Sequence, residues 1–103
     1  MPYGLTESEL GRLRELFTSN ERIMEVVLYG SRAKGTFKPF SDVDITLVGT
    51  RLSRQDLNRL ALAIDDLLLP YQFDISLFHS LRNAALTDHI LRRGQSIYKR
   101  EPA

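Results

Sequence analysis

The stretch LYGSRAKGTFKPFSDVDITLVG (residues 28–49) contains the features that decide the fold. One apolar run ends at Gly30 and Ser31, and a second apolar run begins at Asp42 and Asp44. Short runs of β-branched and aliphatic residues that stop at glycine are typical of buried strands. The stretch therefore predicts two strands, with a turn at the end of the first and two carboxylates at the start of the second.

The flanking sequence predicts helices and further strands. Thr6 and Glu9 have the spacing of a capping box at the start of a first helix, and Ser53 with Asp56 opens a second one. The second helix has an apolar stripe made of Leu57, Leu60, Ala61, Ile64, Leu67 and Leu68. The expected helices end near residue 19, at Pro70 and at Gly94, and the expected strands are residues 23–29, 44–48, 72–78 and 96–98, the last as an edge strand before a frayed tail.

This order of elements predicts an α+β fold, in which helices pack on a small mixed β-sheet. A chain of 103 residues, 43% of them hydrophobic, can bury one core but is too short for two, so we expect a single domain over residues 1–103. The helix over residues 53–69 requires a crossover between the strands that it joins, whereas the loop over residues 30–40 could connect antiparallel or crossing neighbours.

Composition narrows the class of protein. The 14 lysine and arginine residues and 13 aspartate and glutamate residues give a formal net charge of only +1, so nothing in the overall charge suggests a nucleic-acid coat or a membrane-surface protein, and a charged partner must be bound locally. The chain has no cysteine, so it has neither disulfides nor thiolate metal ligands. No segment has the character of a membrane span or a signal peptide. We therefore expect a soluble, cytoplasmic protein.

The two acids at the start of the second strand predict a metal site. Asp42 and Asp44 are two residues apart, so their side chains point to the same face while Val43 and Ile45 point into the core. Two carboxylates held close together repel each other unless a cation lies between them. Carboxylate oxygens without histidine or cysteine suit Mg²⁺ or Mn²⁺ better than Zn²⁺.

A third acid, Asp74, lies in the third predicted strand between Phe73 and Ile75. An apolar strand is a costly place for a charge without a partner. If the third strand lies beside the second, Asp74 completes a three-carboxylate cluster that can hold two metal ions. The alternative is a buried structural acid, satisfied by an arginine or by backbone N–H groups.

The turn Gly30-Ser31-Arg32-Ala33-Lys34 predicts a phosphate site. Glycine lets the backbone turn tightly at the strand end, Ser31 can cap the following helical turn, and N–H groups at a helix start attract phosphate. Arg32 and Lys34 add positive charge that phosphate favours. A phosphate cradle next to a metal-binding acid pair is what polyphosphate transfer requires.

The complete pattern resembles a known family. Gly30-Ser31, ten intervening residues, Asp42-x-Asp44 and a later strand aspartate resemble the DNA polymerase β-like nucleotidyltransferase superfamily. The chain length and the segments GSRAKG and SDVDI are similar to its minimal nucleotidyltransferase (MNT) branch. The resemblance spans residues 28–74 by motif and the rest of the chain by element order.

The resemblance implies a role for each matching residue. It implies that Gly30 and Ser31 hold the nucleotide phosphates, that Asp42 and Asp44 bind the metal ions, and that Asp74 completes the cluster and activates the acceptor hydroxyl.

Two basic residues also match the family pattern. Arg32 matches a position that is usually arginine in the MNT branch. Lys34 stands where arginine is commoner, which concerns the strength of phosphate contact and not the chemistry.

The chain has no residues left to build an acceptor pocket, so a second copy or another protein must supply it. The resemblance implies a partner of the HEPN type, a helical ribonuclease toxin, with the MNT protein as the antitoxin that transfers AMP from ATP onto it. The alternative is a non-catalytic nucleotide-binding module that inhibits its partner by occlusion.

Two further interpretations concern the loop before the acids and the strand that follows. Phe37 and Phe40 are expected to pack within the loop, with base stacking as the alternative. Residues 42–46 also fit the Asp-x-Asp-x-Thr motif of haloacid-dehalogenase-like phosphatases. In those enzymes the motif follows an apolar strand, whereas here it precedes one, so we reject this interpretation.

The remaining charged residues have simpler explanations. His79 and His89 lack the spacing of metal ligands and are interpreted as structural or surface residues. Arg92 and Arg93 are interpreted as helix-end charges that complement the helix dipole.

Overall fold

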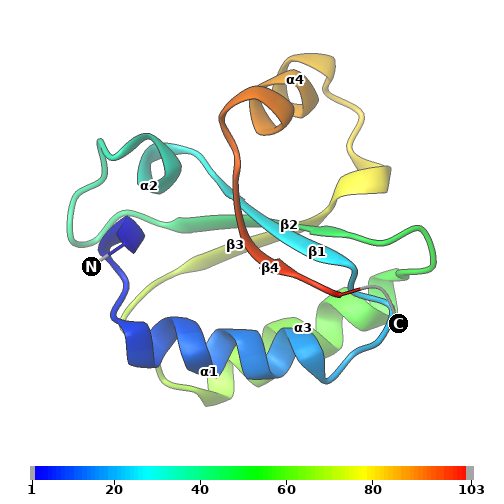
Figure 1. Cartoon of the computed structure of the whole chain (residues 1–103), viewed down its shortest axis with the longest axis horizontal. Coiled ribbons are helices and arrows are strands. Elements are labelled where there is room, and N and C mark those ends of the chain that lie inside the picture. The colour runs from blue at the N-terminus through cyan, green and yellow to red at the C-terminus, as the bar shows by residue number, and fades with distance from the viewer. Residues whose placement is uncertain (1, 102–103) are drawn as a thin grey trace.

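The computed structural model describes residues 2–101 and contains a mixed sheet with helices on both faces (Figure 1). The helices are α1 (Glu7–Thr18), α2 (Ser31–Lys34), α3 (Arg54–Asp66) and α4 (Ala84–Arg93), with 3-10 turns η1 (Pro2–Gly4) and η2 (Phe78–Ser80). The strands are β1 (Glu25–Tyr29), β2 (Val43–Val48), β3 (Phe73–Leu77) and β4 (Gln95–Lys99). The predicted fold class is confirmed.

The strand order in the four-stranded sheet is β3-β2-β1-β4. Strands β2 and β3 are parallel and are joined by the crossover helix α3, as predicted. Strand β1 pairs antiparallel with both β2 and β4, so the connection over residues 30–40 is of the antiparallel kind and β4 is an edge strand. Helices α1 and α3 lie across one face of the sheet, and α2 and α4 lie over the other (Figure 1).

Both predicted helix starts carry a capping box, at Thr6 as predicted and also at Ser53. The Thr6 hydroxyl accepts a hydrogen bond of 3.0 Å from the Glu9 backbone N–H, and Glu9 accepts one of 2.8 Å from Thr6. Ser53 and Asp56 exchange the equivalent bonds at the start of α3, at 3.3 and 2.9 Å. These caps satisfy N–H groups that have no partner within a helix, so local sequence sets where both helices begin.

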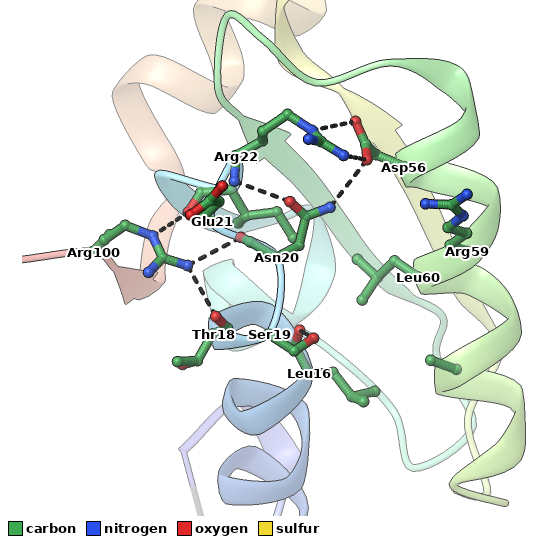
Figure 2. A pocket seen from close by; sticks show the side chains of 12 residues that line it. Leu16, Thr18, Ser19, Asn20, Glu21, Arg22, Asp56, Arg59, Leu60 and Arg100 are labelled. Carbon is green, nitrogen blue, oxygen red and sulfur yellow. Dashed lines mark hydrogen bonds and ion pairs between the residues drawn. The ribbon is translucent and has the colours of Figure 1, made fainter.

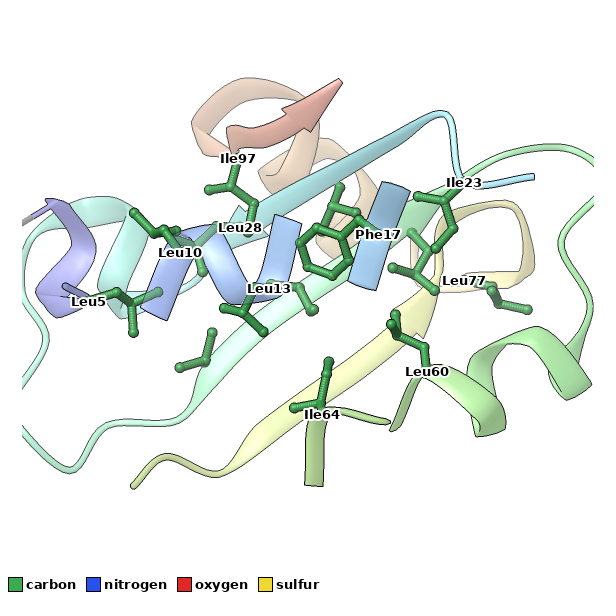
Figure 3. Packing of buried hydrophobic residues seen from close by; sticks show 14 of the residues in the cluster. Leu5, Leu10, Leu13, Phe17, Ile23, Leu28, Leu60, Ile64, Leu77 and Ile97 are labelled. Carbon is green, nitrogen blue, oxygen red and sulfur yellow. The ribbon is translucent and has the colours of Figure 1, made fainter. Parts of the chain in front are cut away.

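The core fills the space between the sheet and helices α1 and α3 (Figure 3). Helical spacing in α1 and α3 and alternation in β1 and β2 send apolar side chains to this one layer. Its central members are Leu10, Leu13, Phe17, Val26, Leu28, Ile45, Leu47, Leu60 and Ile64. Helices α1 and α3 therefore cover the core face of the sheet, and the polar side chains of the strands lie on the opposite face.

Two predictions, one about the end of α3 and one about the C-terminal tail, differ from the structure. Leu68 does not join the apolar stripe: α3 ends at Asp66, and Leu68 has a φ of 56° that leaves its side chain 88% exposed. The predicted frayed tail after Lys99 is wrong for Arg100, whose backbone N–H donates to the Met24 carbonyl at 2.8 Å. Residues 102–103 of that tail lie outside the described residues. The Arg100 guanidinium also donates to carbonyl groups of Thr18, Ile23 and Asn20.

Within residues 2–101, no helix has the length and apolar character needed to cross a membrane.

Candidate active site

Strand register brings the two predicted site residues Asp44 and Asp74 into one row with Tyr29. Tyr29 of β1 lies opposite Asp44 of β2, and Asp44 lies opposite Asp74 of β3. Val43 and Ile45, on either side of Asp44, are buried in the core as predicted, so the row lies on the other face of the sheet. The expectation that the third strand lies beside the second is confirmed, and it places Asp44 and Asp74 side by side.

The electrostatics of this row are repulsive. Partial burial raises the pKa of Asp44 above its usual value, and the negative charges of Asp74 and Asp42 raise that pKa further. Asp42 and Asp74 are both exposed. The alternative that Asp74 is a buried structural acid is wrong, because β3 is an edge strand and Asp74 points away from the core.

The residues present fit a hard divalent cation by their chemistry. The pKa of Asp44 shows that its ionised form is disfavoured, and a bound cation would relieve this repulsion. Carboxylate oxygens are the ligands that Mg²⁺ and Mn²⁺ prefer. In the described part of the chain, however, no three acidic, histidine or cysteine side chains are already grouped to hold a metal ion. The three-carboxylate cluster of Asp42, Asp44 and Asp74 stays a prediction, one in which the side chains would converge on binding.

Gly30 connects the predicted phosphate turn directly to Asp44. Gly30 has a φ of 77° and a ψ of −154°, a backbone conformation that residues other than glycine rarely adopt. A Cβ atom at this position would also lie 2.5 Å from Asp44 Oδ2. Glycine is therefore required both by the backbone and by the close approach of the carboxylate.

Ser31 is the first residue of α2, and the N-cap of that helix is Gly30. Because Gly30 has no side chain, the helix begins without a side-chain cap, and the prediction that Ser31 caps it is wrong. Ser31 is half-buried and directly follows the glycine that touches Asp44. Its position next to the acid row agrees with the sequence prediction, and its phosphate-binding role stays a prediction.

Arg32 does not face the acid row. Its side chain is only 1% exposed, and its guanidinium donates hydrogen bonds to the Ser41 carbonyl at 2.8 and 3.1 Å and to the Tyr3 carbonyl at 2.8 Å. The rings of Phe37 and Tyr71 lie 5.1 and 4.9 Å from it. The predicted phosphate-binding role of Arg32 is not supported: burial directs its donors to loop carbonyls, so Arg32 holds the segment that leads to Asp42.

The two phenylalanines of this loop behave differently. Phe37 packs against Arg32, as loop packing predicts. Phe40 is 81% exposed, so loop packing is wrong for that residue. Base stacking by Phe40 stays an untested alternative.

Three hydroxyl groups in or beside the acid row were missed from sequence, those of Tyr29, Thr46 and Ser76. Thr46 is buried two residues after Asp44, and Ser76, two residues after Asp74, donates to the Thr46 hydroxyl at 2.9 Å. Burial raises the pKa of Tyr29, and the charges of Asp74 and Asp44 add to this while a hydrogen bond with Ser76 opposes it. Tyr29 therefore stays protonated at neutral pH. Strand alternation from the two acids was the signal that pointed to Thr46 and Ser76.

These features match a known protein family. The polymerase beta nucleotidyltransferase family matches residues 12–103. The chain belongs to this family. No curated protein shows significant similarity to it in sequence.

Solved structures similar to this chain include components of toxin–antitoxin complexes. A chain of a toxin–antitoxin crystal structure with AMP-PNP is 20% identical, with a TM-score of 0.72, and the match covers 89% of this chain and 74% of that one. A chain of the MntA–HepT complex is 16% identical, with a TM-score of 0.67 over 92% and 74% of the two chains.

A third similar structure is that of the tri-AMPylated Shewanella oneidensis HEPN toxin with an MNT antitoxin. The matched chain is 16% identical, with a TM-score of 0.65 over 88% of this chain and 70% of that one. At these identities the three structures show a shared fold.

A pocket of about 650 Å³ lies at the end of the sheet opposite to the acid row (Figure 2). It is lined by the end of α1, the start of α3 and Arg100. Asp56 lies in its wall, 3% exposed, and accepts hydrogen bonds from Arg22 at 2.7 and 3.2 Å and from Asn20 at 3.2 Å. These bonds hold the pKa of Asp56 well below its usual range. Asp56 thus has its hydrogen-bond partners within the chain, and it links the loop after α1 to the start of α3.

Proposed function

We propose that the chain is a metal-dependent nucleotidyltransferase that transfers AMP from ATP to a hydroxyl group of a partner protein. The observation that carries the proposal is the direct approach of the Gly30 backbone to the Asp44 carboxylate, with Asp74 opposite on the next strand. A nucleotide phosphate and a metal ion held by these residues would be in contact. Family membership supports nucleotidyl transfer as the chemistry.

Each residue of the site has a role in this proposal. Gly30 and Ser31 hold the phosphates, and Asp42 and Asp44 hold Mg²⁺ or Mn²⁺, which supplies charge neutralisation and orientation when bound. Asp74 completes the metal site and accepts the proton of the acceptor hydroxyl. Lys34 contributes positive charge to the phosphates, whereas Arg32 orders the loop before Asp42.

The proposed partner is a HEPN-type toxin, and the chain would be its antitoxin. Similarity in fold to an MNT antitoxin in complex with an AMPylated HEPN toxin supports this. AMP transfer would add a negative charge and a bulky adenosine to the toxin, which would block a basic RNA-cutting site.

The test is intact-mass spectrometry of the toxin after coexpression with the chain. The wild-type chain should add one or more AMP units, and the Asp42→Asn/Asp44→Asn variant should add none. A toxin that stays unmodified with the wild-type chain contradicts the proposed transfer.

A second candidate function is inhibition by occlusion without catalysis. It is favoured by Arg32, which matches the family pattern but donates its hydrogen bonds to loop carbonyls and does not face the acid row. It predicts that the wild-type chain and the Asp42→Asn/Asp44→Asn variant neutralise the toxin equally well, whereas catalysis predicts that the variant fails.

A further inference from the structure

A pocket of about 570 Å³ lies between the end of α2 and the C-terminal half of α4. The side chains that line it are Ala33, Lys34, His89, Arg92, Arg93 and Gln95. Three of these six carry a permanent positive charge and none is acidic. The pocket therefore presents cations from two separate elements toward one space, which is the arrangement that a multiply charged anion requires.

The pocket lies at the same end of the sheet as the acid row. Lys34 is three residues after Ser31, so the two side chains are neighbours across one helical turn of α2. On the other side, Gln95 pairs with Leu28, the residue before Tyr29 in β1. The pocket is thus next to the phosphate turn and outside the row of acids.

The cations of this pocket are available to a ligand. Arg92 pairs with Asp88 at 3.1 Å, but these side chains are 75% and 61% exposed, and such surface pairs are weak because water screens them. Within residues 2–101, Lys34 and Arg93 form no ion pair. In contrast, the buried Arg32 on the same short helix already donates its hydrogen bonds to loop carbonyls.

The geometry points to this pocket as the site of the β- and γ-phosphates of the nucleoside triphosphate, and of pyrophosphate after the reaction. This inference rests on the proposed function and names the part of the substrate that the site distinguishes. With Lys34, Arg92 and Arg93 in contact with the distal phosphates, the chain selects triphosphates over monophosphates. The interpretation of Arg92 and Arg93 as helix-end charges then covers only part of their role.

The pocket also has a role in the chemical step. The acceptor oxygen forms a bond to the α-phosphorus while the bond from that phosphorus to the bridging oxygen breaks. The electron pair of the broken bond leaves with pyrophosphate, and the hydroxyl proton passes to Asp74. Because negative charge increases on pyrophosphate, cations placed around it lower the barrier.

The experiment measures binding of ATP, pyrophosphate and AMP to the full chain by calorimetry, with Mg²⁺ present. The Arg92→Ala/Arg93→Ala variant should bind ATP and pyrophosphate at least tenfold more weakly and AMP with unchanged affinity. The control is Arg82→Ala, an exposed arginine just before α4 that does not line the pocket, and it should bind all three like the wild type. Both substitutions are at exposed positions, so melting temperatures should match.

Two outcomes overturn the inference. One is a variant whose affinity for ATP and pyrophosphate is unchanged. If that variant also bound the partner protein less well, the pocket would be a docking site for an acidic segment of the partner and not a phosphate site. The other is an equal loss of affinity for AMP. Because the measurement needs no AMP transfer, a chain that binds ATP through this pocket but modifies no partner would contradict the proposed function and leave the pocket assignment intact.

Discussion

Asp44 in β2 and Asp56 in the first turn of α3 lie at opposite ends of the fold and have opposite surroundings. Asp44 has acidic neighbours, and its pKa is raised by partial burial and by Asp74 and Asp42. Asp56 is more deeply buried, but it accepts hydrogen bonds from Arg22, Asn20 and Ser53, and its pKa is strongly lowered. The deeper carboxylate is therefore the more stable in its charged form.

The difference distinguishes a carboxylate that stabilises the fold from one that is available to bind a ligand. At the Asp56 end each carboxylate oxygen has donors within the chain, so the charge contributes to stability. At the Asp44 end the charges repel, so the folded chain carries a cost that a cation would remove. Charges that a chain does not satisfy itself are typical of sites that bind something else.

The largest expected effect is loss of nucleotidyl transfer in Asp42→Asn and Asp44→Asn, because each removes an oxygen ligand of the metal. Without metal, Asp44→Asn should be at least as stable as the wild type at neutral pH. Since folding raises the pKa of Asp44, ionisation destabilises the fold, and the advantage of the variant should vanish as pH falls below about 4.

Thermal melts with and without Mg²⁺ and ATP measure both the stability of each variant and its ability to bind the metal and the nucleotide. Ligand binding should raise the melting temperature of the wild type and not that of either variant. A variant that keeps both the thermal shift and the transfer activity would show that the substituted aspartate does not bind the metal, and the contrast between Asp44 and Asp56 would fail.

Asp74→Asn should reduce turnover by roughly 10² to 10⁴, with little change in ATP affinity, because a proton-accepting or metal-orienting group acts in the chemical step. Stability should hardly change, since Asp74 is exposed. Single-turnover rates and calorimetric ATP affinities separate the two effects. Equal loss of rate and affinity would mean that Asp74 holds the nucleotide and does not act in the step.

Asp56→Ala should destabilise the fold by about 3 kcal/mol, because it removes the helix cap and leaves Arg22 and Asn20 without their acceptor. Folding lowers the pKa of Asp56, so its contribution is complete above a pH of about 4 and is lost as pH falls through the folded-state pKa. The gap between wild type and variant in urea unfolding should shrink in acid.

The control for this change is Asp65→Ala, an exposed acid near the end of α3, which should alter stability little. If Asp65→Ala and Asp56→Ala have the same effect, the contrast between the two ends of the sheet fails.

The smallest expected effect is that of Gly30→Ala, about 2 kcal/mol of stability, because the φ of 77° and the Asp44 carboxylate both oppose a Cβ. Gly35→Ala is the matched control: its φ is 80°, but nothing lies within 4 Å of the added Cβ, so it should cost about 1 kcal/mol. Urea unfolding of both variants measures the difference. Equal costs would show that Asp44 yields without strain.

Local sequence predicted the elements well because their signals act over a few residues. The capping boxes at Thr6 and Ser53 join residues three apart, and strand alternation alone places Val43 and Ile45 opposite to Asp44. The acid pair, the glycine turn and their spacing could therefore be predicted from the sequence.

The tertiary structure decided the rest, because it depends on which distant segments meet. The pairing of β2 with β3 places Asp74 beside Asp44 and on an open face, which no property of the segment QFDISLF indicates.

Arg32 and Arg100 show the same limit for basic residues. In sequence each is a charged residue in a polar segment, yet carbonyl groups of the folded chain bind both guanidinium groups. Sequence alone determined which chemical groups the chain carries and how neighbouring residues are spaced. Only packing decided which charges are satisfied within the fold and which remain to bind a ligand, because burial and hydrogen-bond partners come from segments far apart in the chain.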